Sequence, residues 1–187
     1  MKLRTFIALE VPDVHRQPIA SYLAGWSKAH KQGINWVSGQ NLHLTLQFIG
    51  DTHSGDIPQL KEDLFRLCIK TPAFEMNCLG FELFSARQPR LLWVKLETAD
   101  KGIFTFAKDL NRTVRELGYE PDSKPLKLHI TAARIKVQQP AWLEQEFMQS
   151  GLPAEPAVYG TVTLYQSILK PDGPEYIPLQ QYELKNR

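Results

Sequence analysis

The feature that most constrains this chain is a short segment that occurs twice, in which a histidine and a threonine stand two positions apart. The copies are His43-Leu44-Thr45 and His129-Ile130-Thr131, and the second begins 86 positions after the first in a chain of 187 residues. Polar and apolar residues alternate in both copies, which is the pattern of a β-strand with one buried face. Each copy therefore predicts a strand that carries its histidine and its threonine on the same side.

Strict alternation extends this prediction along the first copy. It places Gln47 beside His43 and Thr45 on the polar face of the strand. It places Phe48 on the opposite face, with the leucines that separate the polar residues.

Predicted helices and strands alternate in both halves of the chain, with turns expected at 85–90 and 170–174. Strands are expected at 4–11, 42–49, 74–84, 91–96, 126–137, 158–169 and 176–184, and helices at 14–29, 57–69, 103–117 and 142–148. Each motif strand follows one helix and precedes another. This spacing predicts a duplicated α+β unit of two lobes, each presenting one motif strand. With no long linker in the chain, we expect residues 1–187 to form a single domain of two interleaved lobes.

Composition excludes some classes of protein. The hydrophobic content of 43% and charged content of 22% are typical of a soluble globular protein, and argue against a disordered chain or a membrane protein. A net charge of +2 does not by itself indicate a nucleic-acid binder. Cys68 and Cys78 have no CxxC spacing, so we expect two reduced, buried thiols. No targeting segment is visible, and we expect a cytoplasmic monomer.

Two such strands facing each other would bring two imidazoles and two hydroxyls together, a set that suits in-line displacement at phosphorus. A neutral histidine can take a proton from water while a protonated histidine gives one to the leaving oxygen. Threonine hydroxyls can donate hydrogen bonds to the non-bridging phosphate oxygens. The motifs therefore predict His43 and His129 as catalytic and Thr45 and Thr131 as phosphate-binding, with no metal and no cofactor.

Structural interpretations stand beside this one. A single His-x-Thr is explained as well by a half-buried histidine, and it is the second copy that favours a catalytic site. Two histidines can also bind zinc, but no Asp, Glu or Cys stands at ligand spacing beside either motif. His15, His30 and His53 lie outside the motifs, and we interpret them as exposed and incidental.

The motif segments and their flanks resemble a known family. Segment 41–50 (NLHLTLQFIG) resembles the first motif region of the two-histidine (2H) phosphoesterase superfamily, and is most similar to the RNA 2',3'-cyclic phosphodiesterases, also called 2'-5' RNA ligases. Segment 128–134 (LHITAAR) resembles their second motif with its trailing arginine. Segment 4–9 resembles their first strand, and segments 164–167 and 176–179 resemble their closing hairpin.

The resemblance implies an α+β fold in which two antiparallel sheets, flanked by helices, surround a central pseudo-twofold cleft. It implies hydrolysis of a 2',3'-cyclic phosphate, on RNA or on a nucleotide, to a 2'-phosphomonoester in RNA processing. It also implies that His43 protonates the 3'-oxygen, that His129 activates water, and that Thr45 and Thr131 bind the phosphate. The residues alone leave open which histidine is the acid and which is the base.

Two basic residues near the second motif have open assignments. Lys127 stands where family members often carry proline or histidine. It precedes His129 by two positions, so a continuous strand would place both side chains on the same face. It is a candidate phosphate contact or a solvated strand end. Arg134 follows His129 by five residues, so strict alternation places it on the opposite face. It reaches the site only if a bulge or the end of the strand changes that parity.

Aromatic side chains can stack on any nucleobase. Phe6 is a candidate substrate contact, although a core position is the preferred interpretation for it and for the other strand aromatics, which are Phe48, Phe84, Trp93 and Tyr165.

Three functional hypotheses remain at this point. The first is a hydrolase that acts on an RNA with a 2',3'-cyclic phosphate end or on a cyclic nucleotide, without membrane association. The second is the same site working in reverse, as a 2'-5' RNA ligase. The third is a nucleotide- or RNA-binding module without turnover, which would not need an acid–base pair of histidines.

Overall fold

The computed structural model describes residues 1–84, 90–122, 124–152, 155–170 and 173–186, and their strands form two antiparallel sheets. The first sheet has the order β3 (His43–His53), β1 (Lys2–Glu10), β8 (Thr161–Ile168) and β9 (Glu175–Glu183). The second sheet has the order β2 (Ile34–Trp36), β6 (His129–Ile135), β5 (Arg90–Glu97), β4 (Phe74–Phe84) and β7 (Ala157–Tyr159). The predicted α+β fold with two antiparallel sheets is confirmed.

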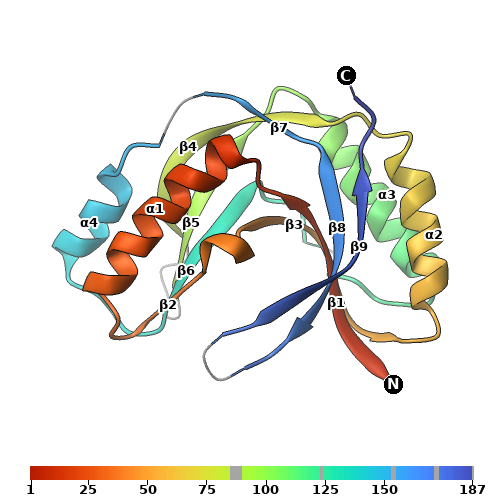
Figure 1. Ribbon diagram of the computed structural model, residues 1–187, viewed down its shortest axis with the longest axis horizontal. Coiled ribbons are helices and arrows are strands. Elements are labelled where there is room, and N and C mark those ends of the chain that lie inside the picture. The colour runs from red at the N-terminus through yellow and green to blue at the C-terminus, as the bar shows by residue number, and fades with distance from the viewer. Residues whose placement is uncertain (85–89, 123, 153–154, 171–172, 187) are drawn as a thin grey trace.

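The helices divide between the two sheets (Figure 1). The described helices are α1 (Asp13–Ala29), α2 (Ile57–Cys68), α3 (Gly102–Glu116), α4 (Ala141–Gln149) and the short 3-10 helix η1 (Gly39–Asn41). Figure 1 shows α2 and α3 on the outer side of the first sheet, and α1 and α4 on the outer side of the second. Because β1 lies in one lobe and α1, which follows it, in the other, the chain crosses between the lobes repeatedly.

The predicted helices each turn one face towards the core. In α3 the buried residues are Ile103, Phe106, Leu110 and Val114, spaced three or four positions apart as one helical face requires. Gly118 follows α3 with a φ of 86°, a conformation that glycine adopts without steric cost. The short elements β2 and η1 have no counterpart in the predicted elements, the predicted strand 158–169 divides into β7 and β8, and β6 begins at His129 instead of 126.

The core is continuous between the lobes. Trp26 of α1 packs edge-on against Phe81 of β4 and Phe147 of α4, with ring centroids 4.9 and 4.7 Å apart. Phe74 of β4 meets Phe106 of α3 at 5.8 Å, which joins the second sheet to a helix of the first lobe. The single domain over residues 1–187 stays a prediction, and this shared core supports it.

Other predictions have mixed outcomes. Cys68 and Cys78 are buried and free, and burial raises the pKa of each thiol to about 12. His53 is exposed as predicted, but the prediction for His15 is wrong. His15 is fully buried, and each of its ring nitrogens has a hydrogen-bond partner there. Nδ1 lies 2.9 Å from the Tyr159 hydroxyl, and Nε2 lies 2.8 Å from the Glu155 carbonyl oxygen.

The two predicted turns include residues 85–89 and 171–172, which lie outside the described residues. His30 is half-buried, with its ring 5.9 Å from that of Trp142.

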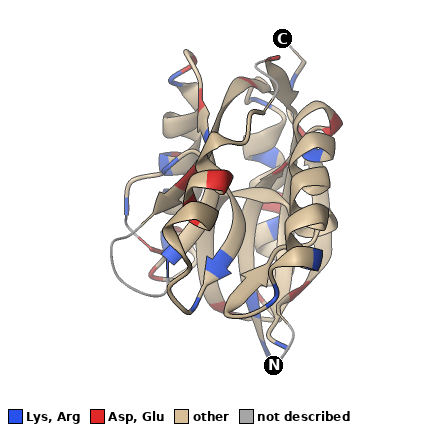
Figure 2. Cartoon of the chain, turned by 90° about the vertical axis from the view of Figure 1, so that its left-hand side faces the viewer, with Lys and Arg blue, Asp and Glu red and all other residues tan. Residues whose placement is uncertain are grey.

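Charged residues are dispersed over the surface. Seen from the side of α1 and α4, acidic and basic positions are interspersed along the chain (Figure 2). Within the described ranges, no helix combines the length and the hydropathy that crossing a membrane requires.

Candidate active site

The two motif histidines are held in the same way. His43 and His129 are the first residues of β3 and β6, and the Nδ1 atom of each lies beside the backbone carbonyl two residues earlier. The distances are 2.7 Å from His43 to the Asn41 oxygen and 2.8 Å from His129 to the Lys127 oxygen. Because a carbonyl oxygen can only accept, Nδ1 must donate in both residues. This leaves Nε2 of each ring as the nitrogen that exchanges a proton with a ligand.

A β-bulge interrupts the alternation of β3 directly after Thr45. Thr45 pairs with Ala8 of β1, but the next pair joins Gln47 to Ile7, so Leu46 is the extra residue. Leu46 and Gln47 are both buried, and Phe48 is 37% exposed. The prediction that Gln47 shares the face of His43 is therefore wrong, because the bulge exchanges the positions of Gln47 and Phe48.

Gln47 instead points into the first lobe. Its Nε2 atom donates to the Asp122 carbonyl at 3.2 Å and to the Phe48 carbonyl at 3.0 Å. Its Oε1 atom accepts from Asn111 of α3 at 3.1 Å. The buried amide thus ties β3 to α3 and to the segment that leads towards the second motif.

The second motif carries a bulge at the corresponding position. Thr131 pairs with Trp93 of β5, and Ala133 pairs with Leu92, so Ala132 is the extra residue. Ala132 and Ala133 are both buried, and Arg134 is exposed on the side of His129 and Thr131. The bulge therefore turns the Arg134 side chain to the face of the sheet that carries His129 and Thr131, which strict alternation had left open.

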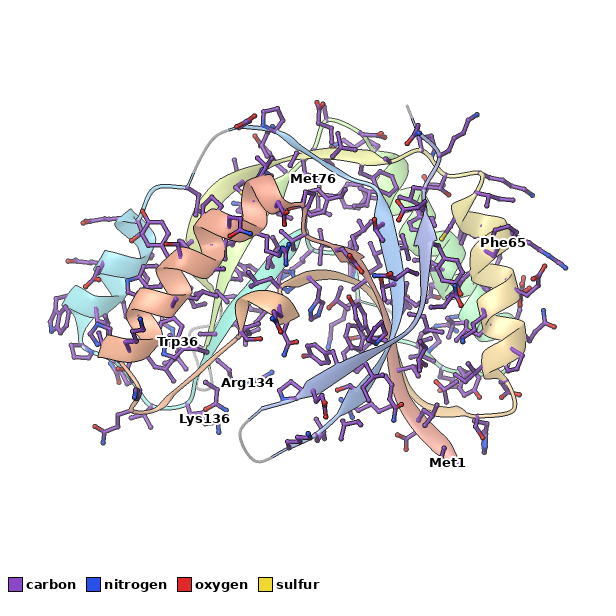
Figure 3. The ribbon with its side chains drawn as sticks, viewed as in Figure 1. Met1, Trp36, Phe65, Met76, Arg134 and Lys136 are labelled. Carbon is purple, nitrogen blue, oxygen red and sulfur yellow. The ribbon has the colours of Figure 1, made fainter. Side chains whose placement is uncertain are left out.

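Arg134 lies close to the opposite lobe. Figure 3 shows it at the lower end of β6, towards the hairpin of β8 and β9. Burial raises the pKa of Tyr176 on β9, and the positive charges of Arg134 and Arg4 partly offset that rise. Tyr176 in turn meets the His43 ring edge-on at 5.2 Å, so Arg134 approaches the first histidine from the second lobe.

An aromatic cluster surrounds His43. The Phe6 ring lies 5.0 Å from His43, 5.2 Å from Tyr165 and 5.7 Å from Phe48, measured between ring centroids. Phe6 is only 1% exposed, so it supports these side chains from beneath and presents little surface to a ligand. Phe48 is the exposed ring of this cluster, and Arg4 lies 5.2 Å from its centroid.

His129 has aromatic neighbours of its own. The Trp93 ring lies 4.4 Å from His129, and Phe84 stacks on Trp93 at 4.3 Å with an interplanar angle of 23°. The Trp93 indole N–H donates to Glu82 at 3.4 Å, and Lys95 pairs with the other oxygen of Glu82 at 3.1 Å. The sequence indicates Phe84 and Trp93 only as strand aromatics with a preferred core position, and no motif indicates Glu82 or Lys95.

The two imidazoles share one electrostatic environment. Burial is the main cause that lowers the pKa of His43, and the charge of His129 lowers it further, while the Asn41 carbonyl acts in the opposite direction. Burial also lowers the pKa of His129, with a further contribution from the charge of Lys127, and the Lys127 carbonyl opposes both. The interaction between the histidines indicates that the fold brings the two motifs together, and β3 does contact β6.

Thr45 and Thr131 are half-buried beside their histidines. Their places match the prediction that each threonine shares a face with its histidine. Within the described ranges, no group of three or more His, Cys, Asp or Glu side chains is arranged to hold a metal ion.

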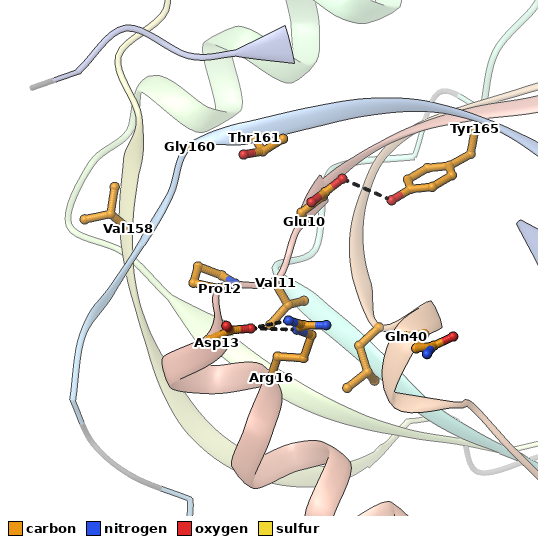
Figure 4. Close-up of a pocket in the computed structure, with 11 residues that line it drawn as sticks. Glu10, Val11, Pro12, Asp13, Arg16, Gln40, Val158, Gly160, Thr161 and Tyr165 are labelled. Atoms are coloured by element: carbon orange, nitrogen blue, oxygen red, sulfur yellow. Dashed lines mark hydrogen bonds and ion pairs between the residues drawn. The ribbon is translucent and has the colours of Figure 1, made fainter. Parts of the chain in front are cut away.

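A hollow of about 400 Å³ lies beside β1 and the start of α1 (Figure 4). Leu42 and Glu10 border it, but neither motif histidine does. Arg16 is paired with Asp13, and Glu10 accepts hydrogen bonds from Thr163 at 2.7 Å and from Tyr165 at 3.5 Å. The carboxylate of Glu10 therefore faces a hollow in which the Arg16 charge is already paired, and such a lining does not favour an anion.

The sequence of the chain is similar to a known family and to individual relatives. A family model described as LigT like Phosphoesterase matches residues 9–93. The chain is similar to an RNA 2',3'-cyclic phosphodiesterase of Thermotoga maritima, with 28% identity over 186 residues that cover 98% of this chain and 96% of the relative. A protein with the same description from Archaeoglobus fulgidus is 28% identical over 186 residues, covering 97% of this chain and 100% of the relative.

Solved structures show the same arrangement of elements. A crystal structure of a Thermus thermophilus protein matches with a TM-score of 0.82 and 26% identity, covering 98% of this chain and 99% of that chain. Escherichia coli LigT, crystallised with 3'-AMP, matches with a TM-score of 0.73 over 99% of both chains. At 22% identity, the second likeness concerns the fold alone.

Proposed function

The chain belongs to the LigT-like phosphoesterases, and on that premise we propose that it is an RNA 2',3'-cyclic phosphodiesterase. In this proposal it hydrolyses the 2',3'-cyclic phosphate at an RNA end, or that of a cyclic nucleotide, to a 2'-phosphomonoester. The reaction needs no metal ion. The relatives from Thermotoga maritima and Archaeoglobus fulgidus carry this activity in their descriptions, and both align over nearly the whole chain.

The matched pair of histidines carries the proposal. Both rings present Nε2 to a shared site, since both Nδ1 atoms are engaged with carbonyl oxygens. His129 takes a proton from water as the water oxygen bonds to phosphorus. The bond from phosphorus to the 3'-oxygen breaks on the opposite side, and His43 gives its proton to that oxygen. The product keeps its phosphate on the 2'-oxygen.

The charge beside His129 supports its role as the base. The charge of Lys127 lowers the pKa of His129, which favours the neutral form that a base requires. Burial and the charge of His129 lower the pKa of His43, and the carbonyl of Asn41 is the group that opposes them. With His129 as the base, in-line displacement leaves His43 on the opposite side of the phosphorus as the acid.

Positive and hydroxyl groups around the pair suit a phosphate. Thr45 and Thr131 stand beside the two imidazoles, where their hydroxyls can donate to the non-bridging oxygens. Arg134 adds a guanidinium from the second lobe, and a charged donor forms a stronger hydrogen bond than a neutral one. The exposed Phe48 ring near His43 offers a stacking surface for the base of the nucleotide. We further propose that the protein works as a cytoplasmic monomer.

Incubation with 2',3'-cyclic AMP, with and without EDTA, tests the proposal. The expected result is 2'-AMP formed at the same rate in both conditions, identified by chromatography against 2'-AMP and 3'-AMP standards. A 3'-AMP product would overturn the assignment of the leaving oxygen. Loss of turnover in EDTA, restored by added metal, would overturn the metal-free mechanism. Binding of 2'-AMP without any turnover would identify the chain as a nucleotide-binding module.

A further inference from the structure

The hollow beside β1 and α1 adjoins the first motif histidine without containing it. Its lining includes Leu42, which directly precedes His43, and Glu10, which is the cross-strand partner of His43. Tyr165 belongs both to this lining and to the aromatic cluster, where its ring centroid lies 6.4 Å from that of His43. With a volume of about 400 Å³, the hollow is large enough for a small ligand or for part of a larger one.

The carboxylate of Glu10 is fixed through only one of its two oxygens. Oε1 accepts hydrogen bonds from Thr163 at 2.7 Å, from Gln181 at 2.5 Å and from the Tyr165 hydroxyl at 3.5 Å. In the part of the chain that the structure describes, no hydrogen bond reaches Oε2. Because a carboxylate accepts at both oxygens, Glu10 offers a positioned acceptor in the lining of the hollow (Figure 4).

This lining suits a neutral base better than a phosphate. The Arg16 charge is paired with Asp13, and the Glu10 carboxylate repels an anion. Pro12 and Val158 add accessible apolar surface, on which the flat face of a base can lie. Oε2 accepts from an N–H donor, and adenine, cytosine and guanine each carry an exocyclic amino group that donates. Uracil has no amino group, and its one N–H lies between two carbonyl oxygens that a carboxylate repels.

The geometry of ribose directs the substrate chain towards the hollow. The 5'-carbon is carried by C4', the neighbour of C3', and the base is carried by C1', the neighbour of C2'. In the proposed hydrolysis the 3'-oxygen lies at His43, so the 5' side of that nucleoside also leaves on the side of His43. Phe48, on which the base of that nucleoside stacks, follows His43 along the chain, whereas Leu42 of the hollow precedes it. The preceding nucleotide therefore extends towards the hollow.

We propose that the hollow binds the base of the nucleotide that precedes the cyclic phosphate, and that Glu10 selects a base with an exocyclic amino group. Bases that are splayed out from a single strand are read through their edges in this way. The inference rests on the proposed function, because it uses the same histidine pair and the same leaving oxygen. It adds a second point of recognition to the RNA end, which is adenine, cytosine or guanine in preference to uracil.

The test compares two dinucleotides that differ by one amino group. Both end in adenosine 2',3'-cyclic phosphate, and the preceding base is adenine in one and unsubstituted purine in the other. In the wild type, kcat/KM for the adenine dinucleotide should exceed that for the purine dinucleotide about tenfold to a hundredfold, the range for a hydrogen bond to a charged group. Equal values in a wild type that hydrolyses 2',3'-cyclic AMP would overturn the subsite while the hydrolase survives.

Glu10→Gln is expected to remove the advantage of the adenine dinucleotide. The amide oxygen is expected in the place of Oε1, where the donors of Thr163, Gln181 and Tyr165 converge. The amide NH2 group then stands in the place of Oε2, where it opposes the amino group of adenine. Because the ratio of kcat/KM values is taken within each protein, a partly unfolded preparation does not alter it.

Glu97→Gln is the matched control, because Glu97 is an exposed glutamate at the end of β5, in the other lobe. It should keep the wild-type ratio. A Glu10→Gln protein that keeps this ratio as well would overturn the selection by Glu10. Absence of 2',3'-cyclic AMP hydrolysis in the wild type would instead contradict the proposed function.

Discussion

Phe48 and Arg134 occupy corresponding positions in the two halves of the site. Each follows its motif histidine by five residues, and each returns to the side of that histidine because a bulge stands at the third position after it. The bulge residues are Leu46 and Ala132. The duplication thus includes a backbone irregularity as well as the His-x-Thr pattern. It gives the first lobe an exposed ring and the second lobe an exposed cation.

Arg134 is predicted to bind the substrate phosphate. Arg134→Ala should lower kcat/KM for 2',3'-cyclic AMP by about tenfold to a hundredfold, the range expected for loss of a hydrogen bond to a charged group. Arg134→Lys should recover part of that loss, because it keeps the charge without the two-pronged geometry. Steady-state kinetics measures both. Arg112→Ala, on the exposed side of α3, is the matched control, and an Arg134→Ala enzyme as active as this control would refute the contact.

Gln47 is predicted to contribute to stability and not to chemistry. Gln47→Ala removes the hydrogen bonds of Gln47 to Asn111 and to the Asp122 carbonyl and leaves these two groups their mutual hydrogen bond at 3.4 Å, which should reduce the free energy of unfolding by about 1–3 kcal/mol. Urea denaturation followed by circular dichroism measures the change, with the exposed Gln180→Ala as control. Undiminished stability together with a large loss of turnover would mean that Gln47 faces the substrate.

The pH dependence follows from the two lowered histidine pKa values. The active form has one protonated and one neutral imidazole, so it is populated between two macroscopic pKa values that both lie below the ordinary 6.5. We expect kcat/KM for 2',3'-cyclic AMP to peak below pH 6.5 and to fall about tenfold per pH unit above the higher of the two values. A plateau of kcat/KM that continues above pH 7 would contradict this expectation.

Lys127 is predicted to shift that profile. Its positive charge lowers the pKa of His129, so Lys127→Gln should raise that pKa and move the acidic limb of the kcat/KM profile to higher pH. The backbone carbonyl that holds His129 is unaffected by the substitution. Lys136→Gln, also on the second lobe, serves as control. An unchanged acidic limb in Lys127→Gln would separate Lys127 from the titration of the base.

Sequence patterns predict the fold class, the helices α2 and α3 to within a residue at each end, and the shared side of each His-x-Thr pair. The predictions are wrong or open where one extra residue in a strand reverses which side chains face the site. Nothing in the residues around Leu46 and Ala132 indicates a bulge, so Gln47 was placed on the wrong face and Arg134 remained open. The approach of Tyr176 to His43 was also unpredictable, because it depends on how the two lobes fold towards each other.

The most direct test of the account is turnover of 2',3'-cyclic AMP by His43→Ala and His129→Ala, with His53→Ala as control. His53 is an exposed histidine at the other end of β3, so it receives the same substitution without contact with the site. We predict that each motif variant keeps the circular dichroism spectrum of the wild type and loses at least about a hundredfold in kcat, whereas His53→Ala retains full activity. A folded His43→Ala or His129→Ala protein that turns over as fast as His53→Ala would contradict the two-histidine mechanism.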